Sequence, residues 1–270
     1  MSRIKTCFDA LKANNEKALI SFVTAGDPHP KHTVSIMHAL VEAGTDLIEV
    51  GVPFSDPMAD GPVIQKACER ALEHDTSLTD ILRMVAEFRE NDQNTPIILM
   101  GYQNPIEVYG AERFANDAKG LVDGVITVDL PPEECAEINQ LYRAANIDSI
   151  FLMAPTTDIS RIRRISEMAS GFLYYVSFKG ITGASNLDIV SVSSKLSEIR
   201  EVTDLPLAVG FGIKDAETAA AVAAVADAVV VGSAIVSLIA KNQEDMPTAL
   251  KEVKSLLQGI KSALDNAGSI

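Results

Sequence analysis

The chain has 270 residues, 47% of them hydrophobic, which suits one large α/β barrel with a sizeable core. A net charge of −14 without a clustered basic face argues against a nucleic-acid-binding protein. No apolar run reaches the ~18 residues of a membrane span, no secretory signal opens the sequence, and the three scattered cysteines suit reduced thiols, so we expect a cytoplasmic protein.

Short apolar runs alternate with amphipathic segments along the chain. Most of the runs are rich in β-branched residues and nearly continuous in apolar character, as strands buried on both faces are. The predicted strands are residues 18–24, 46–52, 96–101, 122–129, 149–153, 172–177, 206–210 and 227–232. The predicted helices between and after them lie near residues 31–43, 78–91, 111–119, 132–145, 158–169, 187–201, 215–225, 233–240 and 247–265.

Two further helices extend this regular pattern. Residues 2–13 predict a helix that closes the bottom of a barrel, and residues 62–73 predict a helix inserted after the second strand. Eight strand–helix units without a Pro/Gly/Ser-rich linker predict a single domain over residues 1–270, folded as an α/β (β/α)₈ TIM barrel. A doubly wound open sheet is the alternative, but it rarely needs eight such even units.

Several predicted strands start at or just after an aspartate. These residues are Asp46, Asp123, Asp148 and Asp227. They fall at the bottom of a barrel, whereas barrel chemistry takes place at the C-terminal face of the strands. We therefore interpret them as caps and surface polar groups.

A glutamate, Glu49, interrupts the apolar second strand. Because side chains alternate along a strand, Ile48 and Val50 suit the helix-facing side, while Glu49 and Gly51 point into the barrel. We expect Gly51 to leave open space there. Barrel interiors are normally filled with Val, Ile and Leu, and no predicted strand offers a Lys or Arg as an ion-pair partner. We interpret Glu49 as a catalytic carboxylate whose burial raises its pKa.

The loop after that strand offers a second carboxylate. Asp56 and Asp60 are both candidates, because the loops after barrel strands form the mouth of the active site. The alternative for either residue is an aspartate that only shapes a turn, and this alternative is stronger for Asp56, which lies between Ser55 and Pro57.

Glycines mark the loops after predicted strands six, seven and eight. Barrels often hold a phosphate between the last two loops and a helix N-terminus, where a backbone without side chains allows close approach. The residues concerned are Gly180, Gly183, Gly210, Gly212, Gly232 and Ser233. The loop after strand six is also the usual position of a mobile lid, in which Thr182 can close over the carboxylates.

Apolar residues near the strand ends complete the expected site. They are Phe22, Met100, Tyr102, Leu152, Tyr174 and Phe211, and together they indicate a flat apolar group beside the phosphate. The predicted strands contain neither the lysine of a Schiff base nor a histidine for a metal, so we expect no metal and no cofactor. General acid–base catalysis by carboxylates remains.

The sequence is similar to one known family over nearly its whole length. The run LIEVGVPFSDPMADGPVIQ at 47–65 resembles the signature of tryptophan synthase α subunits. Further motifs resemble that family at matching intervals: SFVTAGDP (21–28), GYQNP (101–105), DLPPEE (129–134), GITGA (180–184), GFGI (210–213) and GSAIV (232–236). The chain departs from the Ser-Arg of many members at Ser177-Phe178-Lys179, which bears on the closed lid rather than on the chemistry.

The resemblance implies a (β/α)₈ lyase that cleaves indole-3-glycerol phosphate to indole and glyceraldehyde 3-phosphate. It implies an acid–base pair formed by Glu49 and Asp60. It implies phosphate contacts at Gly183, Gly212, Gly232 and Ser233, and indole-side contacts at Phe22, Tyr102 and Tyr174. The implied partner is the pyridoxal-phosphate-containing tryptophan synthase β subunit, in an α₂β₂ tetramer. The resemblance implies that the loop with Asp56 and the GYQNP segment face this β subunit.

Retro-aldol cleavage by carboxylates alone suffices if the indole ring of the substrate, protonated at C3, accepts the electrons of the breaking bond. Two other phosphosugar barrels fit the sequence less well. An indole-glycerol-phosphate synthase would require a lysine in the barrel, and a ribulose-phosphate epimerase would require a His/Asp metal site, and the predicted strands offer neither. A non-catalytic barrel that binds the substrate and only activates its partner would be favoured by the loss of Glu49 or Asp60, yet both are present.

Overall fold

The computed structural model describes residues 2–177, 188–210 and 212–267. Its strands are β1 (Ala18–Thr24), β2 (Leu47–Gly51), β3 (Ile97–Gly101), β4 (Gly124–Thr127), β5 (Asp148–Ser149), β6 (Phe151–Met153), β7 (Leu173–Val176), β8 (Leu207–Gly210) and β9 (Ala228–Val231). All pairings are parallel, in the order β5-β4-β3-β2-β1-β9-β8-β7-β6. The two ends of this order, β5 and β6, are the halves of one strand broken at Ile150, so the sheet closes on itself. The predicted TIM barrel is confirmed.

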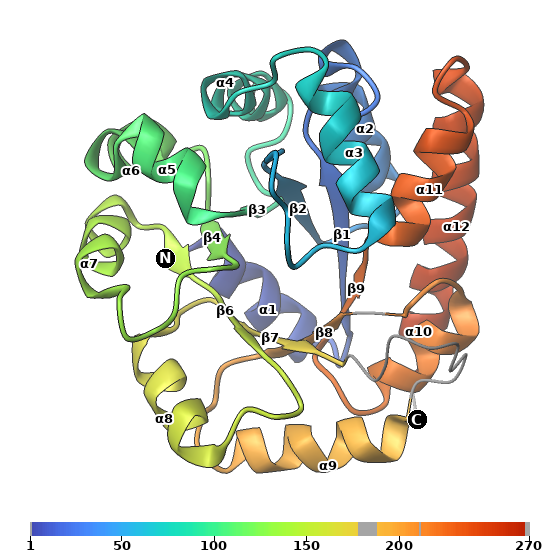
Figure 1. The fold of residues 1–270 in the computed structure, drawn as a ribbon. Coiled ribbons are helices and arrows are strands. Elements are labelled where there is room, and N and C mark those ends of the chain that lie inside the picture. The colour runs from blue at the N-terminus through green and yellow to red at the C-terminus, as the bar shows by residue number, and fades with distance from the viewer. Residues whose placement is uncertain (1, 178–187, 211, 268–270) are drawn as a thin grey trace.

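Helices surround the strands (Figure 1). They are α1 (Arg3–Ala13), α2 (Thr33–Glu42), α3 (Pro62–Leu72), α4 (Leu78–Arg89), α5 (Gln103–Tyr109), α6 (Ala111–Ala118), α7 (Ala136–Ala145), α8 (Ile159–Met168), α9 (Ile189–Arg200), α10 (Ala216–Ala223), α11 (Ser233–Lys241) and α12 (Met246–Ala267), with a 3₁₀ turn η1 (Pro30–His32) before α2. A large apolar core fills the space between this helical ring and the outer face of the barrel.

Helix α5 was not among the predicted helices. Pro105 is the third residue of this helix, where its missing N–H removes no intrahelical bond. The predicted helix 132–145, by contrast, begins later than expected. A turn in which Glu134 N donates to Pro131 O comes first, and α7 begins only at Ala136.

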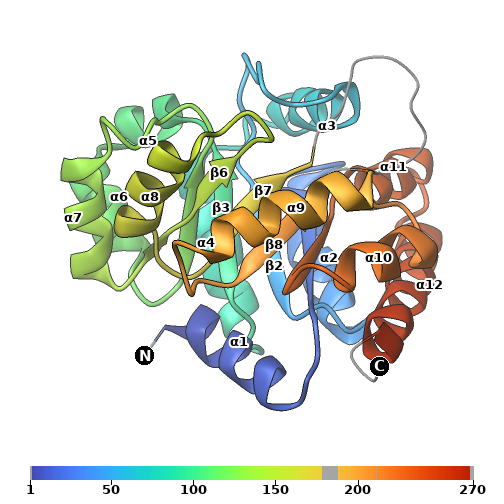
Figure 2. The same ribbon diagram turned by 90° about the horizontal axis from the view of Figure 1, so that it is seen from below.

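Both predicted additions to the barrel are present, and they lie at opposite ends (Figure 2). Helix α1 packs Ile4, Phe8 and Leu11 against inward-facing strand residues such as Ile20 and Ile98 and closes the N-terminal end. Helix α3 lies at the C-terminal end, after the loop that follows β2. The interior is therefore closed by an apolar plug at one end only, which leaves the other end for a site.

The aspartates that precede strands have the structural role expected of them. Asp46, Asp123 and Asp227 each accept a hydrogen bond from a backbone N–H at the start of a neighbouring strand. The donors are Leu19 of β1 at 2.8 Å, Ile97 of β3 at 2.9 Å and Leu207 of β8 at 2.9 Å. Each carboxylate also pairs with a cation from the helical ring, namely Lys261, Arg89 and Arg200 respectively.

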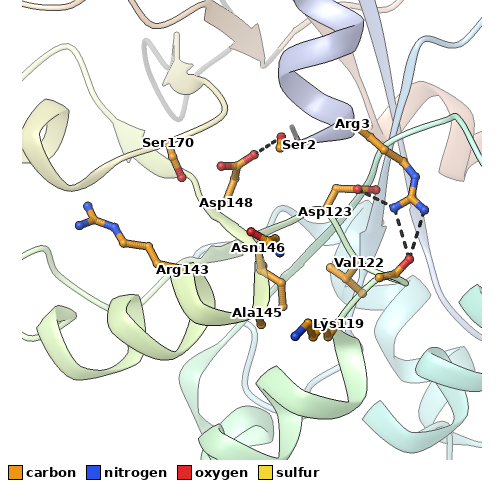
Figure 3. Close-up of a pocket in the computed structure, with 12 residues that line it drawn as sticks. Ser2, Arg3, Lys119, Val122, Asp123, Arg143, Ala145, Asn146, Asp148 and Ser170 are labelled. Atoms are coloured by element: carbon orange, nitrogen blue, oxygen red, sulfur yellow. Dashed lines mark hydrogen bonds and ion pairs between the residues drawn. The ribbon is translucent and has the colours of Figure 1, made fainter.

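A hollow of about 660 Å³ lies at this end of the barrel, beside the start of α1. Figure 3 shows the residues that line it. Arg3 contacts Asp123 at 2.9 Å and the carbonyl oxygen of Gly120, and the Ser2 hydroxyl donates to Asp148 at 2.6 Å. Ser2 and Arg3 thus pair with two aspartates of the hollow, and these contacts hold the start of α1 in place.

The buried pair at this end predicts a stability effect. Arg89 and Asp123 are almost fully buried and lie 2.8 Å apart. Replacing Arg89 by Gln should lower the free energy of unfolding by about 3 kcal/mol, because it leaves the Asp123 carboxylate buried with one cation fewer. Urea denaturation measures this. Arg113→Gln, which breaks an exposed pair with Asp117, is the matched control and should change the value by less than about 1 kcal/mol. Equal effects in the two variants would contradict the structural role given to Asp123.

Candidate active site

A cavity of about 410 Å³ opens among the C-terminal ends of the strands, opposite α1. Five kinds of element line it: strand ends, the loop after β2, the first turn of α3, the loop after β8 and the start of α11. The lining residues are Phe22, Glu49, Ala59, Asp60, Gly61, Pro62, Val63, Ile64, Met100, Val128, Leu152, Tyr174, Val176, Gly212, Ile213, Val230, Gly232 and Ser233. Apolar side chains dominate, and the only acidic ones among the described lining residues are Glu49 and Asp60.

Glu49 lies on the inner face of β2, as the strand alternation predicts. It is fully buried, and neither carboxylate oxygen has a hydrogen-bond partner among the described residues. Its neighbours in the sheet register are Phe22 of β1 and Ile98 of β3, both apolar. Burial raises the pKa of Glu49 to about 8, because the charged form loses its hydration. The carboxyl is therefore a neutral acid at pH 7.

Tyr174 completes the surroundings of Glu49. It is buried on β7 and lines the cavity. Its pKa lies well above the usual value, through burial first and the nearby Glu49 carboxyl second, so the phenol keeps its proton. Gly210 of β8 makes room for this ring, since a Cβ there would lie 2.6 Å from Tyr174 Cζ. That packing role differs from the phosphate approach expected for Gly210.

Gly51 also has a different role from the expected one. We expected it to leave open space above Glu49. A Cβ at Gly51 would lie 2.6 Å from Phe22 Cζ, so the glycine accommodates the Phe22 ring. The space above Glu49 thus has an aromatic wall, with Phe22 on the cavity surface.

Asp60 is half-buried at the cavity wall, in the loop between β2 and α3. Its Oδ2 accepts a hydrogen bond of 3.0 Å from the Tyr102 hydroxyl, which itself accepts one of 3.0 Å from Ala59 N. Its main-chain oxygen accepts a 2.7 Å bond from the Gln65 amide on α3. Burial raises the pKa of Asp60, and the hydrogen bond from Tyr102 opposes that rise. Unlike Glu49, this carboxylate has a fixed donor that favours its charged form.

Asp56 lies elsewhere. Its side chain is exposed, it accepts a hydrogen bond from the Ser55 hydroxyl at 2.5 Å, and it is not among the cavity residues. Of the two carboxylates that the sequence left open, Asp60 is the one placed at the cavity.

Tyr102 lies behind Asp60 rather than on the cavity wall. Its ring packs on Phe54, with centroids 5.2 Å apart, and its hydroxyl holds Asp60. Tyr102 follows β3 directly, where strand alternation no longer fixes the direction of a side chain. A contact from Tyr102 to substrate stays a prediction, whereas its contact with Asp60 is a property of the structure.

The start of α11 forms a further part of the cavity wall. Gly232 is the N-cap residue without a capping side-chain bond, and Ser233 is the first helical residue. The first turn of a helix leaves its N–H groups without intrahelical partners, and such groups bind anions. Gly212, beside them, has a φ of 76°, which side-chain-bearing residues rarely adopt. Thr182, Gly183 and Phe211 lie outside the described residues.

Sequence reasoning missed the wall that α3 provides. Val63 and Ile64 line the cavity from its first turn, next to Asp60. Their position directly after the acidic loop was the available signal, since the helix itself was expected there. Among the described residues, no group of three His, Cys, Asp or Glu side chains could hold a metal ion, and no helix is long and apolar enough to cross a membrane.

A (β/α)₈ barrel with a cavity at its C-terminal face places the chain in the class of barrel enzymes. The family model described as Tryptophan synthase alpha chain matches residues 8–265, and the chain belongs to this family. It is a carbon–carbon lyase of tryptophan biosynthesis, which cleaves indole-3-glycerol phosphate to indole and glyceraldehyde 3-phosphate.

Individual relatives agree over their full lengths. The chain is 57% identical to the tryptophan synthase alpha chain of Thioalkalivibrio sulfidiphilus, with 98% of this chain and 100% of the relative covered. It is 56% identical to that of Methylococcus capsulatus, with the same coverage. The crystal structure of tryptophan synthase subunit alpha from Legionella pneumophila matches with a TM-score of 0.91 and 45% identity, covering 98% of this chain and 99% of that one.

The two loop aspartates provide a direct test of the site. Replacing Asp60 by Asn should reduce the rate of indole release by at least about a hundredfold, because the fixed charge beside the cavity is lost. Replacing Asp56 by Asn in the isolated chain should leave that rate within about twofold. Indole release from indole-3-glycerol phosphate is measured for both. Full activity of Asp60→Asn with a loss in Asp56→Asn would reverse the assignment.

Proposed function

We propose that Glu49 is the general acid and base of the cleavage and that Asp60 stabilises the charge on the indole nitrogen. The observation that carries this proposal is the unpaired, fully buried Glu49 carboxyl with a pKa of about 8 in the wall of the cavity. A neutral carboxylic acid at pH 7 is able to donate a proton, which an ordinary exposed glutamate is not.

The proposed reaction conserves protons and electrons within the site. Glu49 protonates C3 of the indole ring, and the ring becomes an iminium whose N–H donates to the Asp60 carboxylate. Glu49, now charged, removes the proton from the glycerol hydroxyl next to the scissile bond. The carbon–carbon bond then breaks, its electrons return to the ring and neutralise the iminium, and indole and glyceraldehyde 3-phosphate form. Glu49 ends in its starting state, so no cofactor is required.

The two carboxylates suit these different roles because their surroundings differ. Glu49 has only apolar neighbours in the sheet register, which favours its neutral form. Asp60 receives a hydrogen bond from Tyr102, which favours the charged form that an indole cation requires. Gly212, Gly232 and Ser233 also line the cavity, and in this proposal they bind the phosphate through the start of α11. In this proposal Phe22 and Tyr174 contact the indole ring, and Thr182 and Gly183 contribute from the loop after β7.

The role of Glu49 predicts both an activity and a pH effect. Glu49→Gln should reduce indole release by at least about a thousandfold, because an amide cannot exchange the proton, while leaving the fold intact. The folded-state pKa of Glu49 is raised from 4.5 to about 8, so the folded protein binds more protons than the unfolded chain between these values. The stabilisation due to its protonation is complete below pH 4.5 and is lost as the pH rises to about 8.

The wild-type protein should therefore lose stability relative to Glu49→Gln over this interval, and urea denaturation of both proteins from pH 5 to pH 9 measures the difference. Near-normal indole release by Glu49→Gln would refute the catalytic role. A stability difference that does not change with pH would refute the raised pKa.

We also propose a partner, since an α chain of tryptophan synthase implies a β chain. The proposed partner is the pyridoxal-phosphate-containing β subunit, which receives indole in an α₂β₂ tetramer. Two exposed apolar side chains support a contact at the C-terminal face: Met58, 82% exposed in the loop that carries Asp56 and Asp60, and Val108, 81% exposed on α5.

Residues 1–270 are proposed to act as one domain, in the cytoplasm.

A charge on the α5 surface should weaken this assembly. Val108→Asp should raise the Kd for the β subunit by about tenfold or more, because a carboxylate would be buried at the contact, and should leave indole release by the isolated chain unchanged. Val190→Asp is the matched control, since Val190 is also 81% exposed but lies on α9. Affinity is measured by sedimentation or by titration calorimetry. Equal affinities of the two variants would contradict the proposed surface.

A further inference from the structure

Helix α3 determines where one side of the active site lies. Asp60 directly precedes this helix, and Val63 and Ile64 in its first turn line the cavity. The Gln65 side chain also bonds to the main-chain oxygen of Asp60. Glu49, by contrast, belongs to β2 in the barrel itself. The separation of the two carboxylates therefore depends on how α3 is attached to the barrel.

The fully buried residues of α3 are all small, namely Ala67, Cys68 and Ala71. Ala67 packs in a cluster with Phe22 and Val236, and the larger Val63 and Ile64 join this cluster only as partly buried residues. Apolar stabilisation grows with the area removed from water, so small side chains contribute little of it. Gly61, the N-cap residue, makes no capping side-chain bond either.

A partly buried ion pair joins the other end of α3 to the barrel. Arg70 Nε donates to Asp27 Oδ1 at 2.6 Å, and Arg70 Nη2 donates to Asp27 Oδ2 at 2.9 Å. The Asp27 side chain is 2% exposed, although it lies in a loop. It does not line the cavity, so contact with the substrate does not explain its burial. A two-bond contact between planar groups fixes orientation as well as distance.

Asp27 is itself held in the turn that directly follows β1. Its N–H donates to the carbonyl oxygen of Thr24, and the N–H of Gly26 donates to Thr33 Oγ1 at 2.9 Å. Gly26 has a φ of 86°, and the Thr76 side chain fills the space where a Cβ would lie. The turn thus has little freedom. Phe22 on the same strand is the register neighbour of Glu49, so a short rigid path leads from β2 through β1 to α3.

We propose that Arg70 is a positioning residue: through its two bonds to Asp27 it holds α3, and with it Asp60, in a fixed place relative to Glu49. This proposal rests on the proposed roles of Asp60 and Glu49. It gives the Arg70–Asp27 pair a function in catalysis beyond the stability that any buried pair provides.

The first experiment compares two buried pairs at opposite ends of the barrel. Arg70→Gln should reduce kcat for indole release by about ten- to a hundredfold, because small displacements of a catalytic group cost rates of this order. Arg70→Lys, which keeps the charge and loses the paired geometry, should fall between that variant and the wild type. Arg89→Gln breaks a buried pair near α1 and should leave kcat within about twofold, measured at a temperature where each variant is folded. Equal kcat values in Arg70→Gln and the wild type would overturn the proposal.

If Arg70→Gln does not fold, Asp27→Asn/Arg70→Gln replaces it. That variant removes both charges together and leaves no unpaired carboxylate in the protein interior. Its kcat should fall by the same ten- to a hundredfold, since two amides do not reproduce the two charged bonds. Wild-type kcat in this variant would also overturn the proposal.

A double-mutant cycle separates positioning from general structural damage. Arg70→Gln should lower kcat by less than about twofold when Asp60 is already Asn, because no charge remains to be positioned. The same fold-loss in both backgrounds would overturn the positioning role while leaving the proposed function intact. Wild-type activity of Asp60→Asn alone would instead overturn the role of Asp60 in the proposed function, and the positioning role with it.

Discussion

The site depends on one electrostatic constraint: a carboxyl group is buried inside the barrel without a hydrogen-bond partner in the described part of the chain. An ionised carboxylate is strongly disfavoured there, so Glu49 is neutral at pH 7. This protonation state follows from the apolar neighbours that β1 and β3 place beside it. An arginine or lysine on either strand would charge the group and remove the acid. The lack of a cation or hydrogen-bond partner for Glu49 among the described residues therefore matters as much as the residue itself.

Carboxylates at the two ends of the barrel differ in the same terms. Asp123, at the N-terminal end, pairs with Arg3 and Arg89, and its environment is saturated with donors. Such a group stabilises the closure of the barrel, and both of its oxygens already accept hydrogen bonds within the protein. Among residues 2–177, 188–210 and 212–267, Glu49 has no hydrogen-bond donor, and Asp60 has one side-chain donor and an open cavity beside it. The carboxylates at the two ends of the barrel are thus distinguished by how many hydrogen-bond donors and cations contact them in the described part of the chain.

Much of the architecture followed from the sequence because the barrel repeats two strong signals, buried β-branched runs and helical periods. The inward direction of Glu49 also followed, since strand alternation fixes it. The sequence could not show that the Tyr102 hydroxyl bonds to Asp60, because Tyr102 lies just past β3, where alternation ends. Nor could it show that Gly51 accommodates the Phe22 ring. Both depend on contacts between segments distant in the chain.

The most direct test of this account is a titration of Glu49 itself, by ¹³C NMR of protein labelled at the glutamate carboxyl carbons. The Glu49 signal is identified by its loss in Glu49→Gln, and it should titrate with a midpoint near pH 8. A midpoint near 4.5, the ordinary value for glutamate, would mean that the group is charged at neutral pH. The proton donor of the proposed cleavage would then have to be another residue.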